Sequence, residues 1–422
     1  MKKITLITIG THGDVRPYVA LGKGLHHAGF DVCVATHLEF KPFVEKHGLR
    51  FHGVQGNPRD VLESAVGQEL MASGTNVVKF FQEFRNAAQK DMYDGFTDCY
   101  NAAQGADAII FPFFVAGVGH QIARKIGCKT IMGYLQPTLP TAEFPVIMMP
   151  QVSMGHVLNR LSHQTSEWLF WQFFHDVVDR WSRDVLAISP PSRWRGPFKA
   201  LARQSLVLMG YSRHLVPQPR DWKANVHTTG FWLLPEADGY QPPADLEAFL
   251  TESPKPLYLG FGSMAERDTD TLHQDIEHFL ARTQQRAVVM SGWSKRKGEG
   301  HSDRIYHLEQ VPHDWLFPKV SMVVHHGGAG TTATAAHAGV PQIIVPFFGD
   351  QPFWAQRIFG LQLGPQPIPR QQLNDIRLEK AVKQVLKHPR YAHNAQTLGQ
   401  RMAQEHGVAQ AVKQIQDFLD AP

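Results

Sequence analysis

Short apolar runs alternate with segments of helical periodicity from one end of the chain to the other. The runs are rich in β-branched residues and bounded by glycine or proline, which is typical of buried strands. They are residues 4–10, 31–36, 49–54, 106–113 and 129–135 in the first half, and 256–263, 287–293, 304–310, 321–326 and 341–347 in the second. Between the first two runs we predict a helix with Pro17 in its first turn and Gly29 just after its end. Strand–helix–strand units of this kind predict parallel sheets.

Two series of such units predict an α/β fold with two Rossmann-like, doubly wound domains. The boundary is expected in FWLLPEADGYQPP, where three prolines, two acids and a glycine interrupt both periodicities. We therefore expect an N-terminal domain over residues 1–230, a linker over 231–243 and a C-terminal domain over 244–422. The last helix is expected either to stay with the C-terminal domain or to return to the N-terminal one.

Composition narrows the class of protein. The chain has 422 residues with 43% apolar and 19% charged side chains, which fits a folded globular protein. A net charge of +4 is small for this length and does not indicate nucleic-acid binding. Three cysteines far apart give neither a disulfide framework nor a zinc site, so a reducing cytoplasm is expected. The sequence has neither a readable signal peptide nor an uncharged apolar stretch near 20 residues, so we expect no transmembrane segment.

The stretch VVHHGGAGTT, residues 323–332, follows a predicted strand and precedes an alanine-rich helix. Glycines at such a turn let a ligand approach the main chain, and the free N–H groups and dipole of the helix favour an anion, most often phosphate. No GK[ST] follows, so a P-loop is excluded. GAGTTA does satisfy G-x-G-x-x-A, and Asp350 lies about 20 residues on, so an NAD(P)-dependent oxidoreductase is the alternative. That alternative leaves His325 and His326 without a role.

Longer motifs resemble a known family. Residues 311–357, VPHDWLFPKVSMVVHHGGAGTTATAAHAGVPQIIVPFFGDQPFWAQR, resemble the nucleotide-sugar signature of GT-B glycosyltransferases, and within them the sterol 3-β-glucosyltransferase branch. GTHGDVRPYVALGKGL, residues 10–25, resembles the opening of that branch's acceptor domain, and FGSM, residues 261–264, the start of its donor domain. The resemblance implies two domains facing across a cleft, with the acceptor bound by the first and a UDP-sugar by the second.

The resemblance also implies roles for individual residues. His326 and the backbone at Gly328, Ala329 and Gly330 would cradle the pyrophosphate, together with Thr331. Val311 and His313 would border the uracil, and Asp350 and Gln351 would hold sugar hydroxyls. The residues implied to bind the donor are Thr11, His12, Ser263, Val311, His313, His326, Gly328, Ala329, Gly330, Thr331, Asp350 and Gln351. Simpler interpretations stay open: Val311 in the core, His313 as a helix cap and Asp350 as a turn residue.

Glycoside formation also needs a group that takes the proton of the acceptor hydroxyl. Asp14 is predicted in the turn before the Pro17 helix, where a parallel sheet presents its ligand-facing loops, and the resemblance implies a general base there. The alternative is that Asp14 only caps the helix. His12 stands where the sterol branch usually has arginine, so the resemblance implies a donor contact with a shorter reach and a pH-dependent charge.

Residues 166–198 hold four of the nine tryptophans and several arginines. Aromatic side chains with basic neighbours suit an acceptor pocket or a membrane interface, and packed amphipathic helices are the alternative. Trp168, Trp171, Phe174 and Trp181 are spaced so that one helical face can present them, and the first two are the candidate acceptor contacts. Because the sequence begins close to the acceptor-domain motif, we expect any approach to lipid to come from the catalytic body itself.

Taken together, the sequence predicts an inverting glycosyltransferase that moves glucose from UDP-glucose to a hydroxyl of an apolar acceptor, either a sterol-like lipid or a natural product. We expect no cofactor and no metal ion, no nucleic-acid partner, and a location in the cytoplasm or peripherally at a membrane surface. Besides the oxidoreductase, the alternative is a catalytically silent protein that binds a nucleotide sugar or a lipid.

Overall fold

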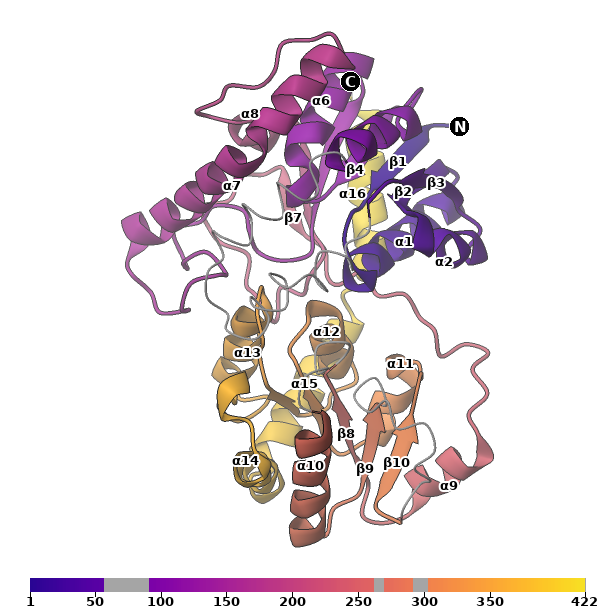
Figure 1. Ribbon diagram of the computed structural model, residues 1–422, viewed down its shortest axis with the longest axis vertical. Helices are drawn as coiled ribbons and strands as arrows, with labels where there is room; N and C mark the ends of the chain where they lie inside the picture. The colour runs from indigo at the N-terminus through magenta and orange to yellow at the C-terminus, as the bar shows by residue number, and fades with distance from the viewer. Residues whose placement is uncertain (57–90, 262–268, 291–302, 422) are drawn as a thin grey trace. The chain divides into compact units, whose positions relative to one another are not determined.

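The computed structural model describes residues 1–56, 91–261, 269–290 and 303–421 (Figure 1). The chain divides into two compact units. Unit 1 comprises Met1–Leu234 together with Glu405–Pro422, and unit 2 comprises Pro235–Gln404. The first crossing between them falls inside the segment 231–243 in which the sequence loses its periodicity. No helix among the described residues is both long enough and apolar enough to cross a lipid bilayer.

Unit 1 is built on a seven-stranded parallel sheet in the order β3-β2-β1-β4-β5-β6-β7. Its strands are β1 (Lys3–Ile7), β2 (Asp31–His37), β3 (Arg50–Val54), β4 (Ala108–Phe111), β5 (Lys129–Tyr134), β6 (Leu206–Met209) and β7 (Val226–Thr228). Central strands such as β4 are buried at every position, as expected when both faces of a parallel sheet are covered. The apolar runs of the sequence predicted the first five of these strands but not β6 and β7.

The helices of unit 1 cover both faces of this sheet. They are α1 (His12–His27), η1 (Leu38–Phe40), α2 (Lys41–Lys46), η2 (Phe113–Val115), α6 (Ala116–Ile126), α7 (His156–Asp184), α8 (Phe198–Gln204) and α16 (Gly407–Asp420). α1 starts at His12, so the expectation that Pro17 occupies its first turn is wrong. The expected glycine end is confirmed, because Gly29 has a φ of 91° and donates its N–H to His26.

The last helix of the chain, α16, belongs to unit 1. Its apolar residues Ala411, Val412 and Ile415 are part of the same core as α1 and the central strands. The two helices approach closely at Gly24, where a Cβ would overlap Val408. Lys129, at the start of β5, donates from Nζ to the carbonyl oxygens of Phe418 and Ala421, 2.9 and 2.8 Å away. Of the two expectations for this helix, the return to the N-terminal part of the chain is the one observed.

Unit 2 contains a five-stranded parallel sheet in the order β10-β9-β8-β11-β12. Its strands are β8 (Leu257–Gly260), β9 (Ala287–Met290), β10 (Ile305–Leu308), β11 (Val323–His325) and β12 (Gln342–Ile344). Its helices are α9 (Ala244–Thr251), α10 (Thr269–Thr283), α11 (His313–Leu316), η5 (Phe317–Lys319), α12 (Ala329–His337), α13 (Gln351–Gly360), η6 (Arg370–Gln372), α14 (Asp375–Lys387) and α15 (Arg390–Ala403). Alternate strand residues pack into two separate cores on opposite faces. The predicted α/β class with two parallel sheets is confirmed.

Candidate functional site

The turn from β11 into α12 lies at the carboxyl edge of the unit 2 sheet, where open α/β folds bind ligands. Gly327 has a φ of 90°, a conformation that favours glycine, and Gly328 is the N-cap of α12. The first backbone bond of the helix runs from the N–H of Thr332 to Gly328, at 2.9 Å. The N–H groups of Ala329, Gly330 and Thr331 therefore have no intrahelical acceptor. A helix terminus of this kind is suited to bind an anion, and phosphate binding at this turn stays a prediction.

His326 lies directly over this turn. A Cβ at Gly328 would overlap the imidazole Nε2 of His326, so the glycine makes room for the ring. The Nδ1 of His326 is buried and has no hydrogen-bond partner among the described residues. Burial lowers the pKa of His326 to about 4, so the ring is neutral at pH 7 and carries one N–H. A neutral imidazole with an unsatisfied buried nitrogen beside a helix N-terminus is suited to donate to a phosphate oxygen.

His325 has a different role. The N–H of Gly327 donates to its Nδ1 at 3.1 Å, and its Nε2 lies 2.9 Å from Oε1 of Gln342. Because Nδ1 accepts, Nε2 must bear the proton and donate to Gln342. Burial lowers the pKa of His325 to about 3. This side chain braces the glycine turn from inside the sheet and does not face a ligand.

Asp350 and Gln351 begin α13, after β12. Nε1 of Trp354 donates to the Asp350 carboxylate at 2.8 Å, and Oε1 of Gln351 accepts from the N–H groups of Phe347 and Phe348, at 2.8 and 3.3 Å. Both side chains thus hold the shape of their own loop. Their contact with sugar hydroxyls stays a prediction.

Residues proposed to border the base lie at the start of α11. His313 is the first helical residue after the N-cap Pro312, so it does not cap the helix. Its Nε2 lies 3.0 Å from the hydroxyl of Tyr258, and its ring stacks on Phe317 with centroids 4.5 Å apart. Val311 is half-buried against the core. Ser263 lies outside the described residues.

Asp14 lies in the first turn of α1, not in the turn that precedes it. Its Oδ2 accepts from the N–H and the hydroxyl of Thr11, at 2.8 and 3.1 Å. Asp14 therefore does cap its helix, and a catalytic role has to be compatible with that bond. His12 is exposed and lies against Phe43, with ring centroids 4.8 Å apart. These residues are at the carboxyl end of β1, the ligand-facing edge of the unit 1 sheet.

The tryptophans of residues 166–198 do not share one environment. Trp171 is buried against Gly117 and donates from Nε1 to the carbonyl of Ser192 at 3.0 Å, and Phe174 and Trp181 are buried as well. Trp168 is instead 43% exposed. The expectation that all four present one face is wrong, and Trp171 is a core residue. Acceptor contact by Trp168 stays a prediction.

Glu167, also on α7, is a further candidate that was not predicted from the sequence. Burial raises the pKa of its carboxyl to about 8, and its charge adds to the burial that raises the pKa of Tyr134. Tyr134 ends β5, so Glu167 lies near the same sheet edge as Asp14. A protonated carboxyl at that edge can donate a hydrogen bond to a polar group of an acceptor. Nothing in the local sequence distinguishes Glu167 from a solvated helix acid.

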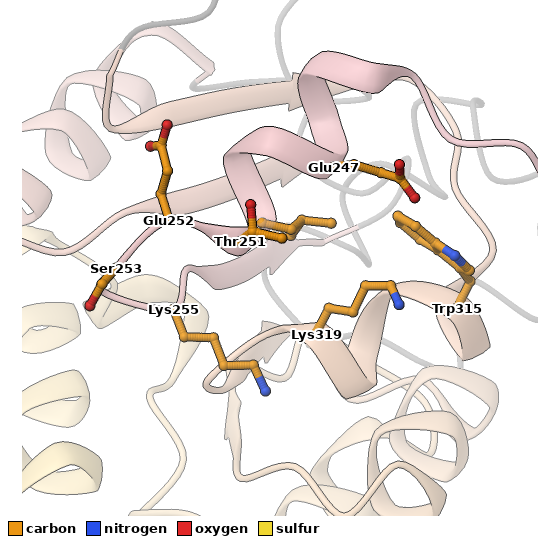
Figure 2. A pocket seen from close by; sticks show the side chains of 8 residues that line it. Glu247, Thr251, Glu252, Ser253, Lys255, Trp315 and Lys319 are labelled. Carbon is orange, nitrogen blue, oxygen red and sulfur yellow. The ribbon is translucent and has the colours of Figure 1, made fainter.

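A hollow of about 640 Å³ lies elsewhere on unit 2, between α9 and the α11–η5 segment (Figure 2). Trp315, Lys255 and Lys319 line it together with Glu247 and Glu252. Lys255 precedes β8, at the amino edge of the sheet, whereas the glycine turn is at the carboxyl edge. This hollow is therefore not part of the anion site.

The geometry argues against the dinucleotide alternative. A ribose-binding acid should end the strand after the glycine turn. β12 ends at Ile344, whereas Asp350 is the N-cap residue of α13 and its carboxylate accepts a hydrogen bond from Trp354.

Within the described ranges, no three His, Cys, Asp or Glu side chains are grouped so that they could hold a metal ion.

Family models match both ends of the chain. The glycosyltransferase family 28 N-terminal domain matches residues 4–99, and the erythromycin biosynthesis protein CIII-like C-terminal domain matches residues 286–418. The sterol 3-beta-glucosyltransferase UGT80A2 of Arabidopsis thaliana is 36% identical over 97% of this chain and 64% of its own length. The sterol 3-beta-glucosyltransferase of Leptosphaeria maculans is 33% identical over 99% of this chain and 29% of its own length. The chain thus spans less than two thirds of these curated relatives.

Solved structures share the fold. The calicheamicin glycosyltransferase CalG4 superposes with a TM-score of 0.73 at 14% identity, covering the whole of both chains. The kitacinnamycin glycotransferase superposes with a TM-score of 0.70 at 18% identity, covering 99% of each chain.

Proposed function

The chain is homologous to the sterol 3-beta-glucosyltransferases and has the GT-B glycosyltransferase fold, and from this premise we propose that it transfers glucose from UDP-glucose to a hydroxyl of an apolar, sterol-like acceptor. The observation that supports this most directly is the anion site of unit 2. One turn brings together three N–H groups at the start of α12 and the imidazole of His326, which has an unsatisfied nitrogen. Gly328 leaves room for this ring, because a Cβ there would overlap it. A diphosphate is the ligand that such a turn suits.

In the proposed reaction the acceptor oxygen attacks the anomeric carbon of glucose from the face opposite UDP. The new C–O bond forms as the bond to the β-phosphate breaks, so the configuration inverts. Asp14 takes the proton of the acceptor hydroxyl, and the α12 terminus with His326 stabilises the charge that grows on the leaving diphosphate.

We further propose that transfer needs neither a cofactor nor a divalent cation. The α12 dipole, its free N–H groups and the His326 donor supply the positive potential that a cation would otherwise provide. Undiminished turnover in excess EDTA supports this assignment, and strict dependence on magnesium or manganese contradicts it.

Ligand-induced thermal stabilisation and turnover together test the proposal. UDP at about 100 times its Kd should add ~2.7 kcal/mol to the free energy of unfolding, and NAD should add nothing. Release of UDP from UDP-glucose that depends on an added sterol or another apolar alcohol establishes transfer. Stabilisation by NAD would favour an oxidoreductase, and stabilisation by UDP with neither transfer nor donor hydrolysis would favour a silent binding protein.

We also propose where the protein works. A glucosyltransferase with an apolar, sterol-like acceptor would work in the cytoplasm and reach that acceptor at a membrane surface.

A further inference from the structure

α7 is apolar on two opposite faces. At 100° per residue, Val157, Leu158, Leu161, Trp168 and Leu169 fall within an arc of about 120°. All five are exposed, from 79% for Val157 to 43% for Trp168 and Leu169. Most of the buried positions of the helix, among them Trp171 and Trp181, lie outside this arc. A helix that packs only on its own domain needs one apolar face, so the outward face requires another explanation.

The segment before α7 extends this face. It exposes Met148, Met149, Val152 and Met154. Hydrogen bonds fix it to the helix, from the N–H of Val146 to the hydroxyl of Ser162 at 3.0 Å and from the N–H of Met154 to the side chain of Asn159 at 3.1 Å. We call these nine residues the α7 apolar surface: Met148, Met149, Val152, Met154, Val157, Leu158, Leu161, Trp168 and Leu169.

The exposed apolar side chains of this protein are concentrated in one part of the sequence. Ten of the sixteen large apolar side chains that are exposed in the described ranges lie between Met148 and Trp194. Scattered single exposed apolar residues need no explanation, but a contiguous group marks an interaction site.

Cations flank the surface at its end nearest Trp168. The side chain of Gln172 donates to the carbonyl of Arg193 at 2.9 Å, which places the Arg193–Trp194–Arg195 segment beside α7. Trp194 is 68% exposed, and the Arg193 guanidinium lies 5.8 Å from its ring centroid. Residues 188–204 contain four arginines or lysines and no acid. Glu167, next to Trp168 in the sequence, has its pKa raised by burial to about 8 and is therefore largely uncharged at pH 7. Asp176, four residues beyond Gln172, is an acid with a side chain that is 60% exposed.

We propose that the α7 apolar surface docks peripherally on an anionic lipid bilayer. Exposed Leu, Val, Met and Trp side chains enter the interface, and Arg193 and Arg195 meet the lipid phosphates. The segment 135–155 connects the carboxyl end of β5 to α7, so the surface starts from the sheet edge that would receive the acceptor. This last step rests on the proposed function, whereas the bilayer contact itself does not.

Co-sedimentation with vesicles tests the docking without nucleotide or acceptor. The full chain should sediment with vesicles in which phosphatidylglycerol replaces a quarter of the phosphatidylcholine, and less with phosphatidylcholine alone. Serine at Val157, Leu161 and Trp168 together should weaken partition on the order of 100-fold, about 5-fold for each side chain because part of each is already buried. Arg193→Gln with Arg195→Gln should weaken binding to the anionic vesicles only.

The matched control is serine at Ile376, Leu386 and Phe359, which are 69%, 48% and 41% exposed on unit 2 and lie outside the surface. This variant should bind vesicles as the unchanged chain does. Because all the substituted side chains are exposed, circular dichroism and thermal midpoints should be unchanged in both triple variants.

The proposal is overturned if the unchanged chain fails to sediment with anionic vesicles, or if both triple variants bind equally. It is also overturned if the protein is a dimer in solution that the α7 substitutions convert to monomer, since the surface is then a protein interface. Failure of glucosyl transfer with intact vesicle binding would remove the proposed function and leave this inference standing.

Discussion

Replacing Asp14 by asparagine separates the helix cap that the structure shows from the general base that we propose. Asparagine keeps an oxygen that can accept from the N–H of Thr11, so the start of α1 should survive. It cannot take a proton at neutral pH. Loss of a general base typically slows turnover ~10²–10⁴-fold, or about 2.7–5.4 kcal/mol in the barrier. Loss of a helix cap, by comparison, costs about 1 kcal/mol of folding free energy.

Turnover at saturating UDP-glucose and acceptor, measured beside a urea unfolding curve, distinguishes these roles. Asp14→Asn should lose turnover with an unchanged midpoint, while Asp14→Ala should lose both. The control is Asn374→Ala, because the Asn374 side chain accepts from the N–H of Arg377 at 2.9 Å and caps α14. That variant should lose about 1 kcal/mol of stability and keep its turnover per folded molecule. Near-normal turnover of Asp14→Asn would refute the assignment of Asp14 as the base.

Further predictions concern the glycine turn of unit 2. His326→Ala should lower turnover ~10²–10³-fold by removing a donor to the leaving diphosphate, and an unchanged steady-state rate would exclude that role. Gly328→Ala should displace the His326 ring and weaken UDP binding about 10-fold in calorimetry, while Gly360→Ala, whose Cβ would meet open space, should have no effect. The contribution of His325 to the free energy of unfolding should be fully present above pH 6.5 and be lost as the pH drops toward 3, because burial lowers the pKa of His325 to about 3 and the unfolded chain takes up the proton first. In urea titrations across that range His325→Gln should show a shallower decline, and an equally steep one would mean that other groups cause it.

Continuous apolar runs in the sequence predicted strands well. A very short strand and a helix with apolar residues on two faces gave no clear pattern. β8, LYLG, appears in the sequence as an uninterrupted apolar segment because both faces of its sheet are covered. β1, KITLI, is buried from Ile4 to Ile7 and is interrupted there only by Thr5. β7 has only the three residues Val226–Thr228, too few to show any period. α7 has apolar residues on both faces, which blurs the helical pattern, so its exposed side could not be told from its core side before the structure.

The spacing of the motifs predicted where the candidate donor site lies, but not which role each of its residues has. Adjacent residues in extended backbone point to opposite sides, so His325, which ends β11, and His326, which follows it, cannot both face one ligand, and the sequence does not say which does. The structure places His325 against Gln342 and His326 over Gly328. Likewise the loop bonds of Gln351 depend on the backbone path after β12, which no local pattern encodes.

The return of α16 to unit 1 imposes an order on biosynthesis. Residues 235–404 form one uninterrupted stretch, so unit 2 can complete its core while the ribosome is still adding the remainder. Unit 1, although begun before unit 2, lacks Ala411, Val412 and Ile415 until α16 has been synthesised. Until then the apolar strip along α1 stays uncovered, so the unit 1 sheet is made before unit 2 and completed after it.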